Sequence, residues 1–285
     1  MLNGNVQVNN ATINVKGTDV DNLLQRVELL IEDCDFIGAL QKCNTILDSN
    51  PMNGKAYFFM LMSILKCCSR DELGKQIWPY DKLPYYIKAM QYGDDKLKSE
   101  LQKYNNVTHA NLRDLQNNLQ MGSTINFGRL ENEQIIIWKV LKIQNNTVLL
   151  ISNDIICTMP FHESETEISW SSCTLRKWLN NEFYNNCFNQ AEQTRILQSK
   201  LNNDSRPDSR GSDGILTTDK VFLLSINEAR QLFNSNTSRQ TGSWWWLRSP
   251  GINSYDAALV KANGDIQTAG YFVDDPNGVR LVSAC

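Results

Sequence analysis

The sequence predicts an α+β protein, with an all-α N-terminal half followed by a half built from antiparallel sheet. Apolar residues recur at helical spacing between residues 18 and 121. From Gly122 onward they occur in short runs bounded by Gly, Asn and Pro, which is the pattern of strands and turns. Two such runs flank Asn263-Gly264, and Asn-Gly between apolar runs is a strong hairpin signal.

These patterns divide the chain into three segments. They are a short strand-like arm at residues 1–17, a helical domain at residues 18–121 and a sheet domain at residues 122–285. The arm alternates apolar and polar residues, and its apolar positions are Val6, Val8, Ile13 and Val15. A short hairpin and a frayed tail explain this alternation equally well, since so small a hairpin is not stable alone.

Length and charge argue against several classes of function. With 285 residues, the chain can form one large or two ordinary domains. Its net charge of −3 gives no electrostatic case for nucleic acid or an anionic membrane as a partner. No stretch has the apolar length of a transmembrane helix, and residues 1–5 lack the basic and apolar regions of a signal peptide. We therefore expect no nucleic-acid partner, no membrane span and a cytoplasmic location.

The eight cysteines are scattered along the chain and include no C-x-x-C pair. Only His109 and His162 could assist a metal site, and they lie far apart in the sequence. We therefore expect reduced cysteines, no bound metal and no cofactor. A serine or cysteine nucleophile needs a nearby histidine as its base, and the sequence offers no such pair, so no catalytic residue is predicted.

The helical half is expected to contain six helical segments. The first begins at the capping pair Thr18-Asp19, and its apolar stripe is formed by Leu23, Val27 and Leu30. The second extends from about Asp35 to Asn50, and the third spans the apolar residues from Ala56 to Leu65. The remaining segments are expected at Tyr85–Tyr92, Asp94–Tyr104 and 107–121.

Three features of the second expected helix resemble a tetratricopeptide repeat. They are the small residue Ala39, the apolar stripe after it and Pro51 directly beyond its end. Leu23 stands where such repeats usually have tryptophan, and only one and a half repeats are visible, fewer than the three or so that a solenoid needs. A plain helical bundle is the alternative interpretation.

In the second half, strands and short helices alternate. Ile135–Ile143 and Val148–Ile151 are expected to pair around a turn at Asn145-Asn146. Later elements are a helix beginning at Ser171 or Ser172, a helix at about 190–200, a polar loop at 202–214, a buried strand at Val221–Leu224 and a helix at Ile226–Phe233. The C-terminal runs are expected to form one compact antiparallel sheet, with strands at Ala257–Val260, Asp265–Gln267, Gly270–Val273 and Val279–Val282.

Eight segments of this half come in a characteristic order. They are Phe127-Gly128, Ile137–Leu141, Leu149–Ser152, Trp170, Ser172–Asn180, Val221–Ser225, Trp246–Gly251 and Gly278–Arg280. The set resembles a large family of uncharacterised bacterial domains of unknown function that carry a W-L-R-S-P-G…G-V-R-P signature. The resemblance covers about residues 122–285, although Leu281 stands where the family has proline. The family in turn is similar in layout to the C-type lectin fold, to formylglycine-generating enzymes and to the variable proteins of diversity-generating retroelements. This is an analogy at the level of the fold.

Six residues are expected to be structural. Four tryptophans within apolar patterns should belong to the core, namely Trp138, Trp170, Trp178 and Trp246. Trp178 should be buried with Leu175 and Leu179 against the terminal sheet. Arg248 and Arg280 are expected to tie loops to backbone carbonyls, because a guanidinium group offers five donors and no acceptor.

Ligand-binding residues are expected in the loops between the late strands, because the C-type-lectin resemblance implies that these loops share one face. The candidates are Trp244, Asn253, Ser254, Tyr255, Asp256, Tyr271, Phe272, Asp274, Asp275 and Asn277. Tyrosine supplies large contact area at low entropic cost, and small polar residues supply adaptable hydrogen bonds. The last three candidates are of types that bind calcium, but a polar turn explains them as well.

Together these features predict a non-catalytic ligand-binding or display protein whose C-terminal loops bind a protein or glycan partner. One form of this hypothesis is a variable protein of a diversity-generating retroelement, with the helical half as an adaptor that contacts a further protein. A lectin of fixed specificity for a small molecule or glycan is one alternative. A formylglycine-generating oxidase is the other, although the terminal region holds only Cys285 where such enzymes need a cysteine pair.

Overall fold

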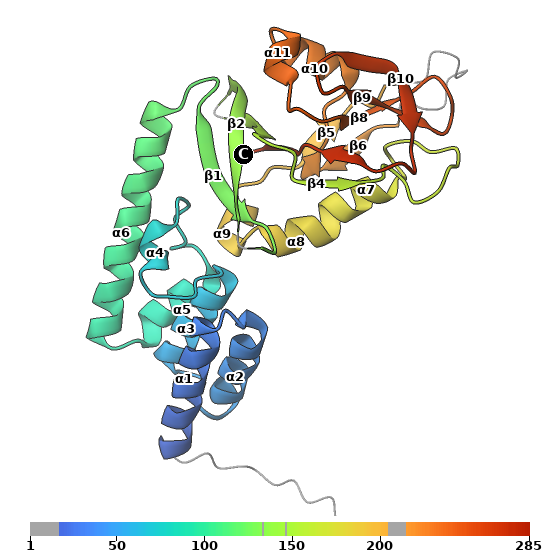
Figure 1. The fold of residues 1–285 in the computed structure, drawn as a ribbon. Coiled ribbons are helices and arrows are strands. Elements are labelled where there is room, and N and C mark those ends of the chain that lie inside the picture. The colour runs from blue at the N-terminus through green and yellow to red at the C-terminus, as the bar shows by residue number, and fades with distance from the viewer. Residues whose placement is uncertain (1–16, 133, 146, 205–214) are drawn as a thin grey trace, which may run out of the picture. The chain divides into compact units, whose positions relative to one another are not determined.

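Helices precede strands along the chain, as the sequence predicts. The computed structural model describes residues 17–132, 134–145, 147–204 and 215–285, and residues 1–16, which make up nearly all of the predicted arm, lie outside it. Helices occupy the first part of the chain and largely antiparallel sheets the second, which gives an α+β layout (Figure 1). The chain separates into two compact units, Met1–Arg113 and Asp114–Cys285, and the division falls inside one helix. The boundary expected at Gly122 stays a prediction.

The helical unit contains six helices, counted over residues 17–118. They are α1 (Gly17–Glu32), α2 (Phe36–Ser49), α3 (Gly54–Ile64), α4 (Glu72–Lys75), α5 (Pro84–Tyr92) and α6 (Asp95–Asn118). Two of them begin where a side chain caps the backbone. The carboxylate of Asp35 accepts a hydrogen bond from the Gly38 amide at 2.9 Å, and the Asn53 side chain accepts one from the Ala56 amide at 2.9 Å.

Two expectations for this unit are corrected. The buried stripe of α1 consists of Leu24, Val27 and Ile31, which is rotated from the expected one by about one residue. The helices expected at 94–104 and 107–121 are a single helix, α6. No glycine or proline interrupts the sequence between them, and Asn105 and Thr108 are buried within the continuous helix.

A disulfide joins Cys34, in the turn between α1 and α2, to Cys68, which follows α3. The prediction that all eight cysteines are reduced is therefore wrong for this pair. Local spacing gave no sign of the pairing, because the two residues are brought together only when α2 and α3 fold back on α1. Disulfides are typical of proteins in oxidising compartments. The expectation of a cytoplasmic location rests on the sequence alone.

None of the helices in the described part of the chain is long and apolar enough to cross a bilayer.

The second unit is organised around two five-stranded sheets. The first has the order β1-β2-β3-β12-β7, and the second has the order β10-β9-β8-β11-β4. The strands of the first are β1 (Thr124–Arg129), β2 (Ile135–Gln144), β3 (Thr147–Ser152), β7 (Val221–Phe222) and β12 (Val282–Ala284). Those of the second are β4 (Cys157–Met159), β8 (Trp245–Pro250), β9 (Asp256–Val260), β10 (Ile266–Phe272) and β11 (Asn277–Val279). A small pair is formed by β5 (Ser199–Leu201) and β6 (Thr217–Asp219).

The predicted hairpins are present. The turn between β9 and β10 uses Asn263-Gly264, where Gly264 has a φ of +86° and the Lys261 amide donates to the Asp265 carbonyl at 2.8 Å. The turn between β2 and β3 contains Asn145 with a φ of +49°, a backbone conformation that asparagine tolerates better than most residues. Its neighbour Asn146 lies outside the described residues.

Short helical turns connect the strands of this unit. They are α7 (Thr174–Trp178), a π-helical turn η1 (Leu179–Phe183), α8 (Tyr184–Cys187), α9 (Gln190–Gln193), α10 (Ile226–Leu232) and α11 (Asn236–Arg239). The helix expected at about 190–200 is limited to α9. The chain leaves the helix because the Leu197 amide donates to the carbonyl of Ala284 in β12 at 2.8 Å, and β5 then begins at Ser199. Most of the polar loop expected at 202–214 lies outside the described residues.

The strand expected at Val279–Val282 is two strands in two different sheets. β11 belongs to the second sheet and β12 to the first, and Arg280 and Leu281 form the crossover between them. β11 also runs parallel to β8, with Gly278 opposite Trp245, so the C-terminal strands do not form one antiparallel sheet. The local pattern of residues 279–282 cannot reveal a change of sheet, because Val279 and Val282 are buried alike in the two strands.

Arg280 holds this crossover. Its Nε donates to the Ser152 carbonyl at 2.9 Å, and its Nη2 donates to the Asn153 carbonyl at 3.1 Å. The guanidinium lies over the rings of Phe233 and Trp245, 5.5 and 5.3 Å from their centroids. Burial lowers the pKa of Arg280 to about 10, so the group stays charged at neutral pH. These contacts are of the kind expected for a structural arginine.

Three of the four expected core tryptophans are fully enclosed, and one is not. Trp138, Trp170 and Trp246 are buried, and the Trp138 indole donates to the Phe127 carbonyl at 2.9 Å. Trp178 is only half-buried, although its neighbours Leu175 and Leu179 are buried as expected. Its ring instead packs against Phe183, with the ring centroids 5.2 Å apart.

A buried carboxylate that the sequence analysis did not single out links three elements of the second unit. Asp219, in β6, accepts hydrogen bonds from the Trp170 indole at 2.9 Å, from the Arg176 Nε at 2.7 Å and from the Thr217 hydroxyl at 2.9 Å. Its side chain is fully buried. A charge in this position is favourable only when it is paired and hydrogen-bonded, so the three donors and the carboxylate depend on one another.

We predict that Asp219→Ala destabilises the protein by about 3–5 kcal/mol, because it leaves a largely buried guanidinium and an indole N–H without their acceptor. Chemical denaturation followed by tryptophan fluorescence measures the change. The control is Asp274→Ala, at an exposed turn, for which a change within about 0.5 kcal/mol is expected. Equal effects of the two substitutions would contradict the structural role of Asp219.

We also predict that residues 114–285 fold without the helical unit, because that stretch contains both five-stranded sheets and their buried residues. The isolated fragment should give a sheet-rich circular dichroism spectrum and a cooperative thermal transition. A spectrum of unfolded chain would show that the two units depend on each other for folding.

Candidate ligand-binding surface

Four aromatic side chains form a continuous row on the second sheet. Tyr255 stacks on Phe272 with ring centroids 6.0 Å apart, Phe272 contacts Tyr271 at 5.8 Å, and Tyr271 contacts Trp244 at 5.8 Å. Trp244, Tyr271 and Phe272 are 36%, 40% and 45% exposed, and Tyr255 is half-buried. We call these four residues the aromatic row. It is composed entirely of residues that the sequence analysis selected, and it brings together the segment before β8, the turn between β8 and β9 and the end of β10.

The position of the row follows from the geometry of β10. This strand is at the edge of the second sheet, so its outer side has no partner strand among the described residues. Its pairing with β9 shifts between Gln267 and Tyr271, which is a bulge. Bulges at sheet edges bend the strand and redirect its side chains, and here Tyr271 and Phe272 are both exposed although they are consecutive.

Two glycines allow the bulge. Gly270 has a φ of +87°, and a Cβ there would lie 2.8 Å from the Cα of Gly251. A Cβ on Gly251 would lie 2.5 Å from the Ala269 carbonyl oxygen. The backbones of β10 and of the turn after β8 can therefore approach each other only because neither residue has a side chain.

The polar candidates in the turn between β8 and β9 are mostly engaged within it. Asp256 is buried, and its carboxylate accepts a hydrogen bond from the Asn253 amide group at 2.7 Å. The Asp256 carbonyl also accepts from the Gly251 amide at 2.8 Å, and the carbonyl of half-buried Ser254 accepts from the Ile168 amide at 3.0 Å. These residues fix the shape of the turn that carries Tyr255, and exposed Ile252 lies in the same turn.

A polar hollow adjoins the row at Trp244. It has a volume of about 710 Å³. Its lining is rich in hydroxyl and amide groups, which come from Thr158, Thr241, Ser243 and Asn277. The Nδ2 of Asn277 is buried and makes no hydrogen bond within the described chain. An amide donor without a protein partner indicates a place for a ligand or water oxygen.

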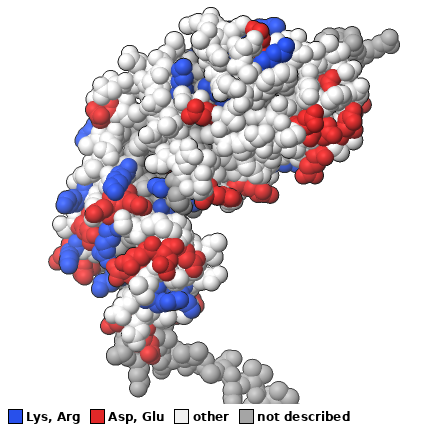
Figure 2. All heavy atoms as spheres, in the orientation of Figure 1, with Lys and Arg blue, Asp and Glu red and all other residues white. Residues whose placement is uncertain are grey.

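Asp274 and Asp275 lie in the turn between β10 and β11, where the Asp275 amide donates to the Phe272 carbonyl at 3.2 Å. Asp274 is exposed and Asp275 is half-buried. Across the described ranges, no group of three or more His, Cys, Asp and Glu side chains is arranged to hold a metal ion. The two carboxylates add negative charge beside the row, whereas most of the face of this unit seen in Figure 2 is uncharged.

The W-L-R-S-P-G segment that forms most of β8 serves the scaffold. Buried Arg248 forms an ion pair with Glu228 of α10, and its Nη1 donates to the Leu223 carbonyl at 2.8 Å. Glu228 also accepts from the Ser225 amide at 2.9 Å and so caps α10. The hydroxyl of Ser249 accepts from the Ile226 amide at 2.8 Å. These contacts hold α10 on β8.

Cysteine chemistry is not favoured near this surface. Cys157 directly precedes Thr158 of the hollow, and burial raises the pKa of its thiol to about 11, so it is protonated at neutral pH. A nucleophilic cysteine requires the opposite shift, since the thiolate is the reactive form.

Sequence reasoning found the row but missed the hollow. Thr158 lies in β4, Thr241 and Ser243 lie far from it in the segment before β8, and no local pattern marks them. Their convergence depends on β4 lying beside β11, which is the pairing that the sequence did not predict.

Comparison with known families gives one match. Residues 145–282 match the model of a family described as "Domain of unknown function (DUF6273)". The matched region contains the whole second sheet, the aromatic row and the polar hollow, and it lacks β1 and β2. No curated protein and no solved structure matches the chain.

We predict that Gly270→Ala destabilises the protein by at least about 1 kcal/mol more than Gly242→Ala does. Both glycines have a left-handed φ, so both substitutions carry that conformational cost. Only at Gly270 would the new Cβ collide with backbone, since nothing lies within 4 Å of a Cβ at Gly242. Denaturant midpoints of the two variants measure the difference. Equal midpoints would show that the close approach of the two backbones is unimportant.

Proposed function

We propose that the second unit is a non-catalytic ligand-binding module that holds a protein or glycan partner on the aromatic row and the adjoining polar hollow. The observation that carries the proposal is the row itself. Four aromatic rings in mutual contact, three of them exposed, form an apolar patch that the core does not require. Contiguous exposed apolar patches of this kind mark interaction sites in soluble proteins.

The combination of row and hollow favours a glycan over a flat protein surface. The C–H face of a sugar ring is apolar and slightly positive, so it packs against the electron-rich face of an aromatic ring. Sugar hydroxyls need donors and acceptors, and the hollow beside Trp244 offers the hydroxyl groups of Thr158, Thr241 and Ser243. A volume of about 710 Å³ lies in the range of small-ligand sites.

We extend the proposal to the whole chain by analogy. The expected C-type-lectin-like layout would display the row on a scaffold that tolerates changes in its loops, as the variable proteins of diversity-generating retroelements do. In that form the helical unit, tetratricopeptide-like or a plain bundle, is an adaptor for a further protein. A template repeat with adenine-specific differences beside the gene would favour the diversified form over a lectin of fixed specificity.

We predict that replacing Tyr255, Tyr271 and Phe272 together by alanine abolishes binding on a glycan array and leaves thermal stability nearly unchanged. Each ring is partly exposed and none is among the buried core residues, so their loss should remove ligand contacts more than core packing. Ile252→Ala is the matched control, because Ile252 is 56% exposed in the turn that carries Tyr255 but is outside the row.

Three results would count against the proposal. The first is unchanged glycan binding by the triple variant, which would move the site elsewhere. The second is a loss of binding by Ile252→Ala as large as that of the triple variant. The third is that the wild-type chain binds nothing on the glycan array and that crosslinking in host lysate captures no protein at the aromatic row.

A further inference from the structure

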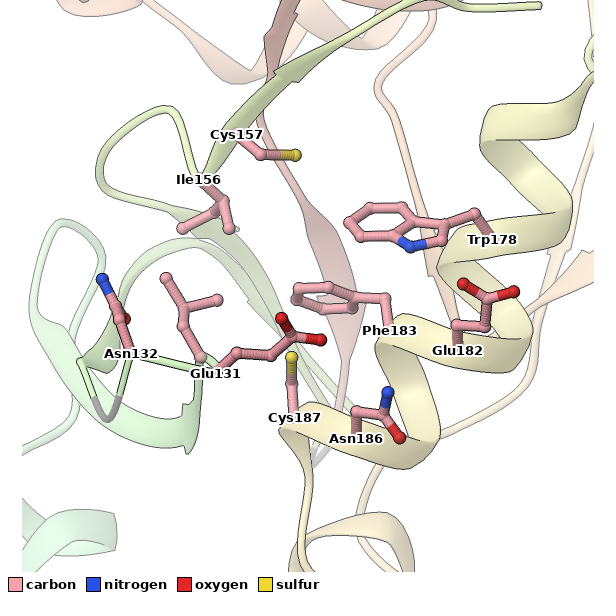
Figure 3. Close-up of a pocket in the computed structure, with 10 residues that line it drawn as sticks. Glu131, Asn132, Ile156, Cys157, Trp178, Glu182, Phe183, Asn186 and Cys187 are labelled. Atoms are coloured by element: carbon pink, nitrogen blue, oxygen red, sulfur yellow. The ribbon is translucent and has the colours of Figure 1, made fainter. Parts of the chain in front are cut away.

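A second hollow in the β-rich unit is separate from the aromatic row and has a different lining. Figure 3 shows this pocket, which has a volume of about 400 Å³. One wall of the pocket is the helical stretch formed by α7, η1 and α8. The other wall is formed by the turn after β1 and the turn before β4. It shares no lining residue with the polar hollow at Trp244.

The helical wall depends on the π-helical turn η1. In a π-helix the backbone hydrogen bonds run from residue i to residue i+5, so a side chain five positions along returns to the same side. Trp178 and Phe183 are five positions apart, and their rings contact each other with centroids 5.2 Å apart. Both rings point into the pocket in Figure 3. In a regular α-helix, with 3.6 residues per turn, these two rings would diverge around the helix axis.

The opposite wall comes from two loops, and three of its residues are apolar. Leu130 follows β1, and Ile156 and Cys157 lie at the start of β4. The sulfur of Cys157 points toward the Trp178 ring in Figure 3. Burial raises the pKa of this thiol to about 11, so it contributes no negative charge at neutral pH. The half-buried indole and these residues together form a cleft into which an apolar group can insert.

The charged side chains that line this pocket are all acidic. Glu131 and Glu182 line the pocket from opposite walls, and neither side chain makes an ion pair with any described residue. The residues that line the pocket in the described chain include no lysine or arginine. Two carboxylates and the rings of Trp178 and Phe183 thus line the same pocket (Figure 3).

We propose that this pocket binds a small organic cation, an amine or a quaternary ammonium group carried on an apolar or aromatic body. The positive group would lie between the carboxylates of Glu131 and Glu182 and against the Trp178 ring, where charge attraction and the ring quadrupole act in the same direction. The apolar body would fill the cleft between Phe183 and Ile156. An anion would be repelled by both carboxylates, and a neutral apolar molecule would leave both without a partner.

The test uses the full chain and two probes of nearly equal shape, 2-phenylethylammonium and neutral 2-phenylethanol. Titration is followed by tryptophan fluorescence and by the indole N–H signals in NMR spectra. The wild-type protein should bind the cation at least about tenfold more tightly than the alcohol, because only the cation gains charge-assisted and cation–π contacts. High salt should reduce this preference, since exposed charges are screened.

The double variant Glu131→Gln/Glu182→Gln should lose most of the preference for the cation while still binding the alcohol. The matched control is Glu163→Gln/Glu165→Gln, which removes the same net charge at exposed positions outside the pocket. Trp178→Leu should weaken both probes. Circular dichroism verifies that each variant is folded, and Trp178→Phe replaces Trp178→Leu if the latter is not.

Three outcomes would overturn the proposal. One is equal affinity of the wild-type protein for the two probes, which would mean an apolar cleft without selection for charge. Another is the same loss in the glutamine double variant and in its control, which would indicate a nonspecific effect of net charge. The third is the absence of saturable binding of the cation at millimolar concentration. None of these outcomes bears on the aromatic row, so the two proposals can fail independently.

Discussion

The buried guanidinium of Arg280 is the interaction on which the second unit depends. It occupies the point where the chain leaves one sheet and enters the other, and it binds the backbone carbonyls of Ser152 and Asn153 at the end of β3. The neighbouring Leu281 amide donates to the Ser152 hydroxyl at 3.0 Å, and the Ser152 amide donates to the Leu281 carbonyl at 2.8 Å. The Arg280 side chain thereby contacts both sheets, through two carbonyls at the end of β3 and through the Trp245 ring of β8.

Buried polar side chains and exposed aromatic ones have separate roles in this unit. Arg248, Arg280 and Asp219 are enclosed and hydrogen-bonded to neighbouring elements, so they help to determine how helices and loops are placed on the sheets. Two residues of the aromatic row belong to the edge strand β10, and the other two lie directly before β8 and in the turn between β8 and β9. A surface of this kind can change its residues with small consequences for folding, which is the property that a recognition surface requires.

The sequence predicted the architecture better than the connections within it. The change of apolar period at Gly122 and the Asn263-Gly264 turn identified the α+β layout and the last hairpin, because these signals are local. The sheet to which β12 belongs is not a local property, and a buried strand has the same apolar composition in either sheet. The same reason applies to the Cys34–Cys68 disulfide.

The candidate sites differ in how far the sequence could reveal them. Tyr271 and Phe272 were selected because the C-type-lectin resemblance implies that the segments between the late strands share one face, and because tyrosine supplies large contact area at low entropic cost. The pocket at Trp178 was missed because an amphipathic helix predicts a core position for this tryptophan. The π-helical turn moves the ring to the edge of the core, and no spacing rule for regular helices anticipates that displacement.

The crossover at Arg280 also has a consequence for the order of folding during synthesis. β12 lies between β3 and β7, so the first sheet remains divided until residues 282–284 have been translated. Until then β3 presents an unpaired edge of apolar residues, which is the kind of edge that pairs with other chains. Closing the sheet then requires contacts between residues far apart in sequence, and such contacts slow folding. Substitutions near the C-terminal strand should therefore affect the yield of folded protein in cells more than their cost in equilibrium stability suggests.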